Sequence, residues 1–107
     1  MADDVLLVLS TFPDAATARR IGREVVEQRC AACANIVPQI ESIYWWEKKV
    51  ENATETLVLF KTTADRYAAL ETTLRQLHPY DVPEIIALPV EQGLPDYLRW
   101  VSENCAS

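Results

Sequence analysis

Two prolines, Pro79 and Pro83, bound a short segment whose side chains could bind a metal ion. The segment and the residues on either side of it supply an imidazole, a phenol and two carboxylates, from His78, Tyr80, Asp81 and Glu84. An imidazole nitrogen can bind Cu²⁺, Ni²⁺ or Zn²⁺, and carboxylate oxygens can complete such a site. The alternative is structural, because a histidine can end a helix by bonding its last carbonyls, and acidic residues can cap a turn.

Three cysteines supply the remaining soft ligands. An odd number, in a chain that begins without the basic region of a signal peptide, indicates free thiols and not a disulfide framework. Cys30 and Cys33 form a C-x-x-C pair, but no second pair accompanies it, which leaves the redox and zinc interpretations weak. Cys33 is either a small buried residue or a soft-metal ligand. Cys105 lies in a terminus that we expect to fray.

The composition argues against several classes of function. The net charge of −6 argues against a nucleic-acid partner. No apolar run approaches the roughly 18 residues of a membrane helix, which predicts a cytoplasmic protein without a membrane partner. With two glycines in the chain there is no phosphate loop, and no catalytic triad can be assembled, so we predict that the protein is not an enzyme and assign no catalytic residue.

We predict a single domain, residues 1–107. The first half of the chain predicts a strand, a helix and two further strands. Residues 5–9 form an apolar run, typical of a central strand covered on both faces. Asp14 can cap the helix that follows. Residues 35–46 predict a strand interrupted at Pro38, a residue found at edges and bulges. Residues 47–52 predict a charged hairpin tip, and residues 54–62 the returning strand.

The second half predicts a helix, a strand and a final helix. Thr63 can cap a helix whose apolar stripe ends at His78. The stripe consists of Tyr67, Leu70, Leu74 and Leu77. Residues 84–90 predict the last strand. Residues 95–103 predict a short helix with three side chains turned inward, Tyr97, Leu98 and Val101.

This order is the βαββαβ plan of ferredoxin-like α+β folds, with helices on one face of an antiparallel sheet and an added C-terminal helix. In that plan the second and fourth strands are edges, which places Cys33 and Glu84 at opposite edges of one subunit. They could meet only where the edges of two subunits approach, in a head-to-tail contact that can close into a ring. Residues 43–46, Ile-Tyr-Trp-Trp, put large side chains on both faces, one for the domain's own helices and one for another subunit.

Five segments together resemble the CutA divalent-cation tolerance family. They are Ala32-Cys33-Ala34-Asn35-Ile36-Val37-Pro38, Ser42-Ile43-Tyr44-Trp45-Trp46, Lys61-Thr62-Thr63, His78-Pro79-Tyr80-Asp81-Val82-Pro83-Glu84-Ile85 and Tyr97-Leu98-Arg99-Trp100. The chain departs from the family pattern at Lys48, where glycine is usual, and at Ser10 and Leu77, where some bacterial members carry cysteine and histidine.

The resemblance implies a ferredoxin-like homotrimer linked to tolerance of copper and other divalent metals. We therefore predict a metal-responsive trimer whose intersubunit clefts hold a divalent ion, Cu²⁺ in the first instance, with Cys33, His78 and Glu84 as ligands. One alternative is a signalling trimer like the nitrogen-regulatory PII proteins, which binds small molecules between subunits. Another is a structural trimer in which metal binding is incidental.

Overall fold

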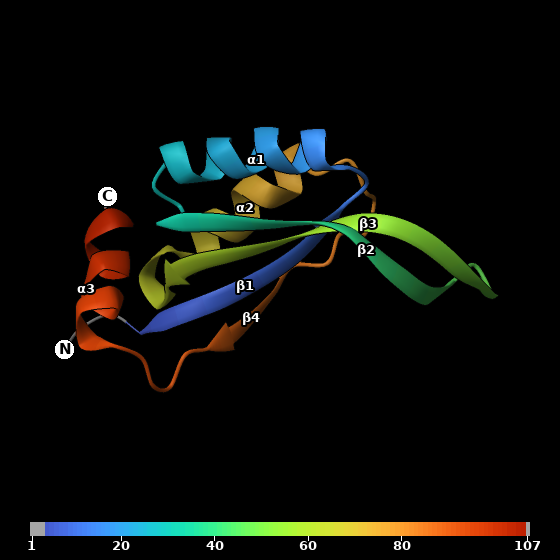
Figure 1. Cartoon of the computed structure of the whole chain (residues 1–107). Coiled ribbons are helices and arrows are strands. Elements are labelled where there is room, and N and C mark those ends of the chain that lie inside the picture. The colour runs from blue at the N-terminus through green and yellow to red at the C-terminus, as the bar shows by residue number, and fades with distance from the viewer. Residues whose placement is uncertain (1–3, 107) are drawn as a thin grey trace.

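A four-stranded antiparallel sheet forms the centre of the protein. The structure, a computed structural model, describes residues 4–106. Its elements in order are β1 (Val5–Phe12), α1 (Ala15–Glu27), β2 (Cys33–Trp46), β3 (Lys49–Thr63), a 3₁₀ turn η1 (Ala64–Arg66), α2 (Tyr67–Leu77), β4 (Ile86–Pro89) and α3 (Pro95–Asn104). The strand order is β2-β3-β1-β4 (Figure 1). This confirms the ferredoxin-like α+β plan, with β2 and β4 at the edges.

Helices α1 and α2 cover one face of the sheet, and α3 lies at the end of the sheet where β1 begins (Figure 1). The core lies between the sheet and these two helices, because both present an apolar stripe to it. Its largest fully buried side chains are Phe12, Phe60, Ile21, Leu70 and Leu74. Among residues 4–106, no helix is long and apolar enough to cross a membrane.

The sheet face opposite α1 and α2 is covered by a helix only at one end, where Val5 of β1 packs against Val101 of α3. Leu7 and Leu9 of β1 alternate with the buried Val8, so they point to this face and remain half-buried. Their partners on β4, Leu88 and Ile86, are 45% and 50% exposed. The prediction that β1 is covered on both faces is therefore wrong for a single subunit, because this plan places its helices on one side.

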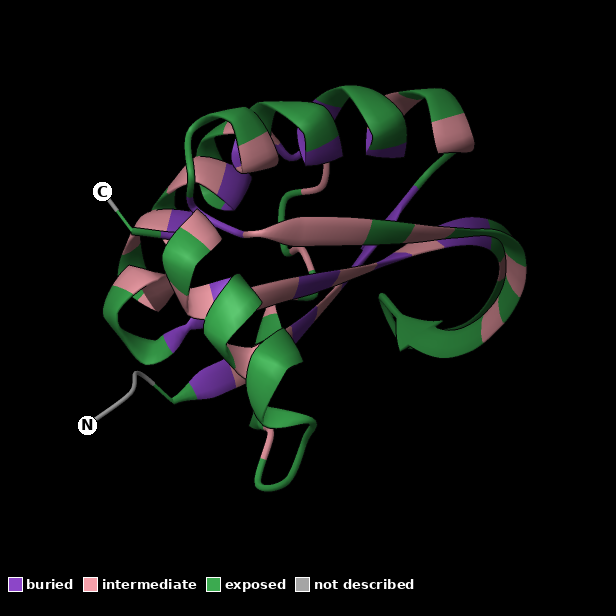
Figure 2. Ribbon diagram, turned by 60° about the vertical axis from the view of Figure 1, so that its left-hand side comes forward, coloured by how far each residue is buried: buried purple, intermediate pink, exposed green. Residues whose placement is uncertain are grey.

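Strands β2 and β3 continue beyond the sheet as a curved two-stranded arm, residues 40–55. Most of this arm is exposed (Figure 2). The predicted irregularity at Pro38 is confirmed, because the β2–β3 register shifts between Val37 and Ile40. The predicted tip at residues 47–52 is too long. The turn comprises only Glu47 and Lys48, both with positive φ, and β3 starts at once.

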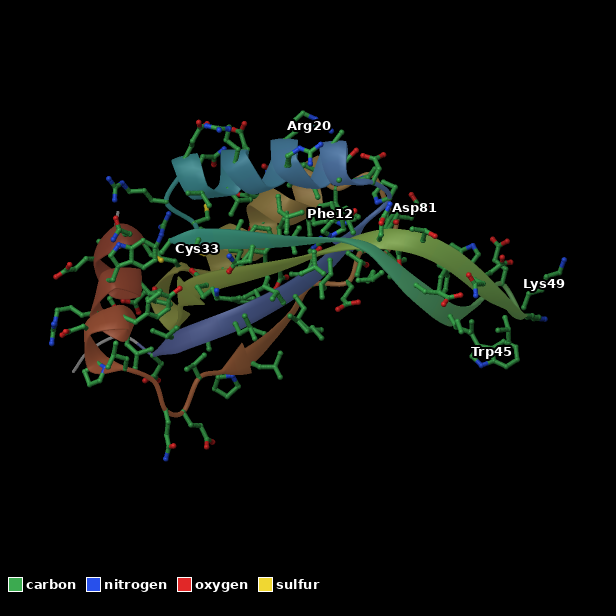
Figure 3. The ribbon with its side chains drawn as sticks, in the orientation of Figure 1. Phe12, Arg20, Cys33, Trp45, Lys49 and Asp81 are labelled. Carbon is green, nitrogen blue, oxygen red and sulfur yellow. The ribbon has the colours of Figure 1, made fainter. Side chains whose placement is uncertain are left out.

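The tryptophans of this arm do not pack on the subunit's own helices, contrary to the prediction. Trp45 is 73% exposed and Trp46 is 47% exposed, and Trp45 lies near the tip of the arm (Figure 3). The arm extends past α1 and α2, so within one subunit neither helix is in reach of its tip (Figure 1).

Two boundaries and one side-chain orientation in the second half differ from the sequence prediction. Thr63 makes no capping hydrogen bond from its side chain and precedes η1, so α2 begins only at Tyr67. Strand β4 is short, and Glu84 lies in the loop before it. Tyr97 is 41% exposed and stacks on Trp100, so only Leu98 and Val101 of the predicted trio pack inward.

Candidate functional site

The loop between α2 and β4 begins as the two prolines predict. His78 is the C-cap of α2, with extended backbone angles (φ −70°, ψ 134°), and its backbone N–H donates to the Leu74 carbonyl at 2.8 Å. Extended angles follow from Pro79, whose ring excludes helical angles for the residue before it. The loop then passes the end of β1 and returns along the edge as β4.

His78 is buried and both of its ring nitrogens are engaged. Nε2 lies 2.8 Å from the Thr11 carbonyl oxygen, and Nδ1 accepts from the backbone N–H of Tyr80 at 3.2 Å. Since Nδ1 accepts, the ring proton belongs on Nε2, which donates to Thr11. Burial lowers the pKa of His78, against the opposing effects of the Thr11 carbonyl and the charge of Glu55. The imidazole is therefore neutral at pH 7.

Tyr80 joins this loop to the β2–β3 arm. Its hydroxyl donates to Oε2 of Glu55 at 2.7 Å, and Glu55 is only 9% exposed. Burial, followed by the hydrogen bond to Glu55, raises the pKa of Tyr80. The side chain remains a phenol across the physiological range and acts as a hydrogen-bond donor.

A cavity of about 680 Å³ lies between the arm and the loop. Three carboxylates line it, from Glu55, Asp81 and Glu84. Three aromatic side chains do so as well, from Tyr44, Trp46 and Tyr80. Hydroxyl groups of Thr11 and Ser42 add polar atoms. The cavity is thus lined by both carboxylates and aromatic rings, a combination suited to a positively charged guest.

Cys33 lies far along the sheet from this cavity, whose position is marked in Figure 3 by the lining residue Asp81. Its thiol donates to Oδ1 of Asn35 at 3.3 Å and lies 4.0 Å from Nζ of Lys61, which also donates to Asn35. Lys61 opposes Cys33 across the β2–β3 ladder, which explains this grouping. Lys61 therefore pairs with Asn35 within the subunit.

Within one subunit the three predicted metal ligands do not converge. His78 and Glu84 belong to the α2–β4 loop, and Cys33 to the opposite edge strand. Residues 4–106 contain no group of three or more His, Cys, Asp or Glu side chains placed to hold a metal ion. The separation agrees with the expectation that Cys33 and Glu84 could meet only between subunits.

The remaining cysteines are structural. Cys30 is buried, with Sγ 3.6 Å from Oγ1 of Thr73. Cys105 was expected to fray, but it is fully buried as the C-cap of α3, and burial raises the pKa of its thiol. All three cysteines are free thiols.

Sequence reasoning missed Glu55, the most buried acid of the cavity. The sequence does predict one aspect of its position. Glu55 alternates in phase with Leu57 and Leu59 along β3, which places it on the sheet face away from the helices. Its pairing with Tyr80, 25 residues later, has no local signature.

This topology, with a proline-bounded loop beside an acidic cavity, places the chain among the small ferredoxin-like α+β proteins that carry a ligand-sized pocket. Within that class the chain belongs to the CutA1 divalent ion tolerance protein family, whose model matches residues 6–104. The family predicted from the sequence motifs is thereby confirmed.

Individual relatives agree with this assignment. The chain is 47% identical to the divalent-cation tolerance protein CutA of Thermus thermophilus, over 92% of this chain and 95% of that protein. It is 50% identical to mouse Protein CutA over 87% of this chain, but spans only 52% of the mouse protein. Other vertebrate relatives are also longer, and the chain spans 62% of the Xenopus laevis homologue.

Solved structures show the same fold. CutA from Xylella fastidiosa superimposes with a TM-score of 0.93 at 43% identity, covering 96% of this chain and 99% of that one. CutA1 from Oryza sativa gives a TM-score of 0.93 at 39% identity, covering 96% of this chain and 94% of the rice chain.

Proposed function

We propose that this protein is a homotrimer that binds a divalent cation, Cu²⁺ in the first instance, between its subunits. The observation that carries the proposal is that Cys33 begins edge strand β2, whereas Glu84 lies in the loop leading into the opposite edge strand β4, within a family described by divalent ion tolerance. A head-to-tail contact of such edges brings a thiol of one subunit toward a carboxylate of the next. Thiolate and carboxylate, with an imidazole, form a mixed ligand set for Cu²⁺ or Zn²⁺.

The uncovered sheet face supports the assembly. Its apolar side chains include Leu88 and Ile86, each about half exposed, and the arm adds Trp45, which is 73% exposed. Large apolar side chains left exposed on a sheet face and on a projecting arm typically mark contacts between proteins. Three copies related by a rotation bury this surface in a closed ring.

His78 is the third proposed ligand. Burial keeps its ring neutral, so a metal ion meets an imidazole that has no proton to lose from Nδ1. Binding there requires the metal to replace the hydrogen bond from the Tyr80 backbone N–H, which engages that nitrogen. The loss of this hydrogen bond therefore weakens metal binding at His78.

The PII-like alternative is disfavoured by the charge of the cavity. Nucleotide phosphates require cationic side chains or helix N-termini. The cavity instead presents Glu55, Asp81 and Glu84. ATP should give no saturable binding isotherm.

We also propose a cytoplasmic location, supported by the three free thiols. Fractionation of the native host with an antibody against the protein tests this directly. Recovery with the periplasmic or organellar fraction would contradict it.

The metal proposal is tested by calorimetric titration of the reduced protein with Cu²⁺ and Zn²⁺, with light scattering on the same samples. We expect a trimer and a saturable isotherm, weakened about tenfold or more in Cys33→Ala, Glu84→Gln and His78→Ala. Glu91→Gln removes an equal charge from an exposed residue outside the proposed site and should bind as the wild type does. A monomer, or binding indifferent to all three substitutions, would overturn the proposal.

A further inference from the structure

The cavity between the arm and the α2–β4 loop contains a buried negative charge without a positive partner. Glu55 is 9% exposed, and the one hydrogen bond its carboxylate accepts within residues 4–106 comes from the Tyr80 hydroxyl at Oε2. The ion pairs of the described chain, Arg23 with Glu27 and Arg99 with Asp96, lie elsewhere. Buried carboxylates are normally paired with a cation.

Two further acids share the same cavity. Asp81 and Glu84 line it from the loop, while Glu55 lines it from β3, so negative charge faces the space from two sides. Low-dielectric walls strengthen the field between such groups compared with that in water. The cavity therefore favours a positively charged guest over a neutral one of the same shape.

Aromatic side chains also line the cavity. Tyr44 and Trp46 come from β2, and Tyr80 comes from the loop. Aromatic rings attract ammonium and guanidinium groups through their faces and also pack against apolar carbon. A guest with a cationic head and an apolar body would thus find a complement for each part.

The volume of the cavity and the separation of its acids favour an organic cation over a bare metal ion as the guest. The volume, about 680 Å³, is in the range of sites for small organic ligands. A metal ion needs three or more ligands converging within bonding distance, and the described residues place no such group of acids, histidines or cysteines together. Dispersed carboxylates suit an ammonium group, which offers three N–H donors and no coordination sphere to fill.

We propose that this cavity binds a small organic ammonium compound with an apolar or aromatic body, its cationic head paired with Glu55 and Asp81. This ligand class is separate from the divalent cation of the proposed function, and the proposal does not depend on metal binding. The hydroxyl of Tyr80 fixes Oε2 of Glu55, which leaves Oε1 for the guest.

Calorimetric titration with 2-phenylethylamine, in the presence of a chelator, tests the proposal on the full chain. We expect saturable binding at about neutral pH, and at least about tenfold weaker binding of 2-phenylethanol, which has the same body without the charge. Glu55→Gln should weaken amine binding about tenfold or more. Glu91→Gln, with the same loss of charge at an exposed position away from the cavity, should leave it unchanged.

Asp81→Asn provides a second variant at an exposed position, so the test stands even if Glu55→Gln fails to fold. It should weaken amine binding by several-fold. Absence of saturable amine binding to the wild type, equal binding of amine and alcohol, or wild-type affinity in the cavity variants would overturn the proposal. Because a chelator is present, each of these results is independent of whether Cu²⁺ binds between the subunits.

Discussion

The imidazole of His78 lies stacked on the ring of Phe12, with ring centroids 4.5 Å apart and planes inclined by 18°. Phe12 is the fully buried last residue of β1, so the stack joins the α2–β4 loop to the core. The hydrogen bond from Nε2 to the Thr11 carbonyl joins the same ring to the backbone of β1. These two contacts fix the position of the loop that lines the acidic cavity relative to β1.

This burial predicts that stability falls in mild acid. The pKa of His78 is lowered from 6.5, so between the folded and the unfolded pKa the unfolded chain binds more protons. The contribution of the neutral ring is complete above about pH 6.5 and decreases as the pH falls below it. His78→Gln keeps a donor for Thr11 but does not titrate.

Urea denaturation of both proteins at about pH 7.5, 6.5 and 5.5 measures the effect. We expect the wild-type free energy of unfolding to fall relative to that of His78→Gln as the pH decreases. A difference that stays constant or grows toward acid would show that the ring is not held neutral. Using the difference between the two proteins removes titrations that they share.

A second prediction concerns Ser10, whose hydroxyl is buried without a hydrogen-bond partner among the described residues. Such a group loses its hydration without compensation. Ser10→Ala should therefore raise the free energy of unfolding by about 1 kcal/mol in urea denaturation.

Thr62 provides the matched control. Its hydroxyl is also buried, but it donates to the Cys30 carbonyl at 2.6 Å. Thr62→Val should lower stability by about 1 to 3 kcal/mol, because the Cys30 carbonyl is then left unpaired. If Ser10→Ala were as destabilising as Thr62→Val, the Ser10 hydroxyl would have a partner after all.

The elements of the fold could be predicted because their determinants are local. Asp14 caps α1 by accepting from the Thr17 backbone N–H at 2.7 Å, as its place before the helical periodicity indicates. Pro38 marks the break in the β2–β3 register, and Pro79 ends α2. Each of these effects depends on one residue and its immediate neighbours.

The candidate site was only partly predictable because its contacts join distant segments. Tyr80 and Asp81 were recognised as polar groups on a stiff loop. Glu55, which accepts a hydrogen bond from Tyr80 and shares the cavity with Asp81, comes from the distant strand β3. Cys105 was expected to be mobile because the sequence cannot show the packing of α3 against Val5. Local patterns predict which groups are present, whereas sheet register decides which of them meet.

The turn at the tip of the arm leads to a third prediction. Glu47 and Lys48 have φ values of 49° and 69°, so both lie in the left-handed region, as in a two-residue type I′ hairpin. A non-glycine residue in this region costs about 1 kcal/mol. Lys48→Gly should recover most of that cost, giving a gain of up to about 1 kcal/mol in thermal or urea denaturation.

The adjacent Lys49 distinguishes this effect from a general effect of glycine. It is the exposed first residue of β3 and has no positive φ. Lys49→Gly should lower stability by about 0.5 to 1 kcal/mol, because glycine loses more freedom in a strand. A loss of stability in both variants would contradict the strain argument for Lys48.

The fourth prediction separates folding from assembly by means of Trp45, which is 73% exposed in one subunit. If the arm packs on a neighbouring subunit, this ring is buried there and acts as an anchor of the interface. Trp45→Ala should then weaken association by about 2 kcal/mol, or about 30-fold, in sedimentation measured over a range of protein concentrations.

Phe60→Ala, in the fully buried core, should instead lower the stability of the subunit by about 3 to 5 kcal/mol. Since Trp45 contributes little to the subunit's own core, its variant should keep the wild-type secondary structure even where it dissociates. Unchanged association of Trp45→Ala would mean that the arm is not part of the interface, and the assembly would then have to use the uncovered face of the sheet alone.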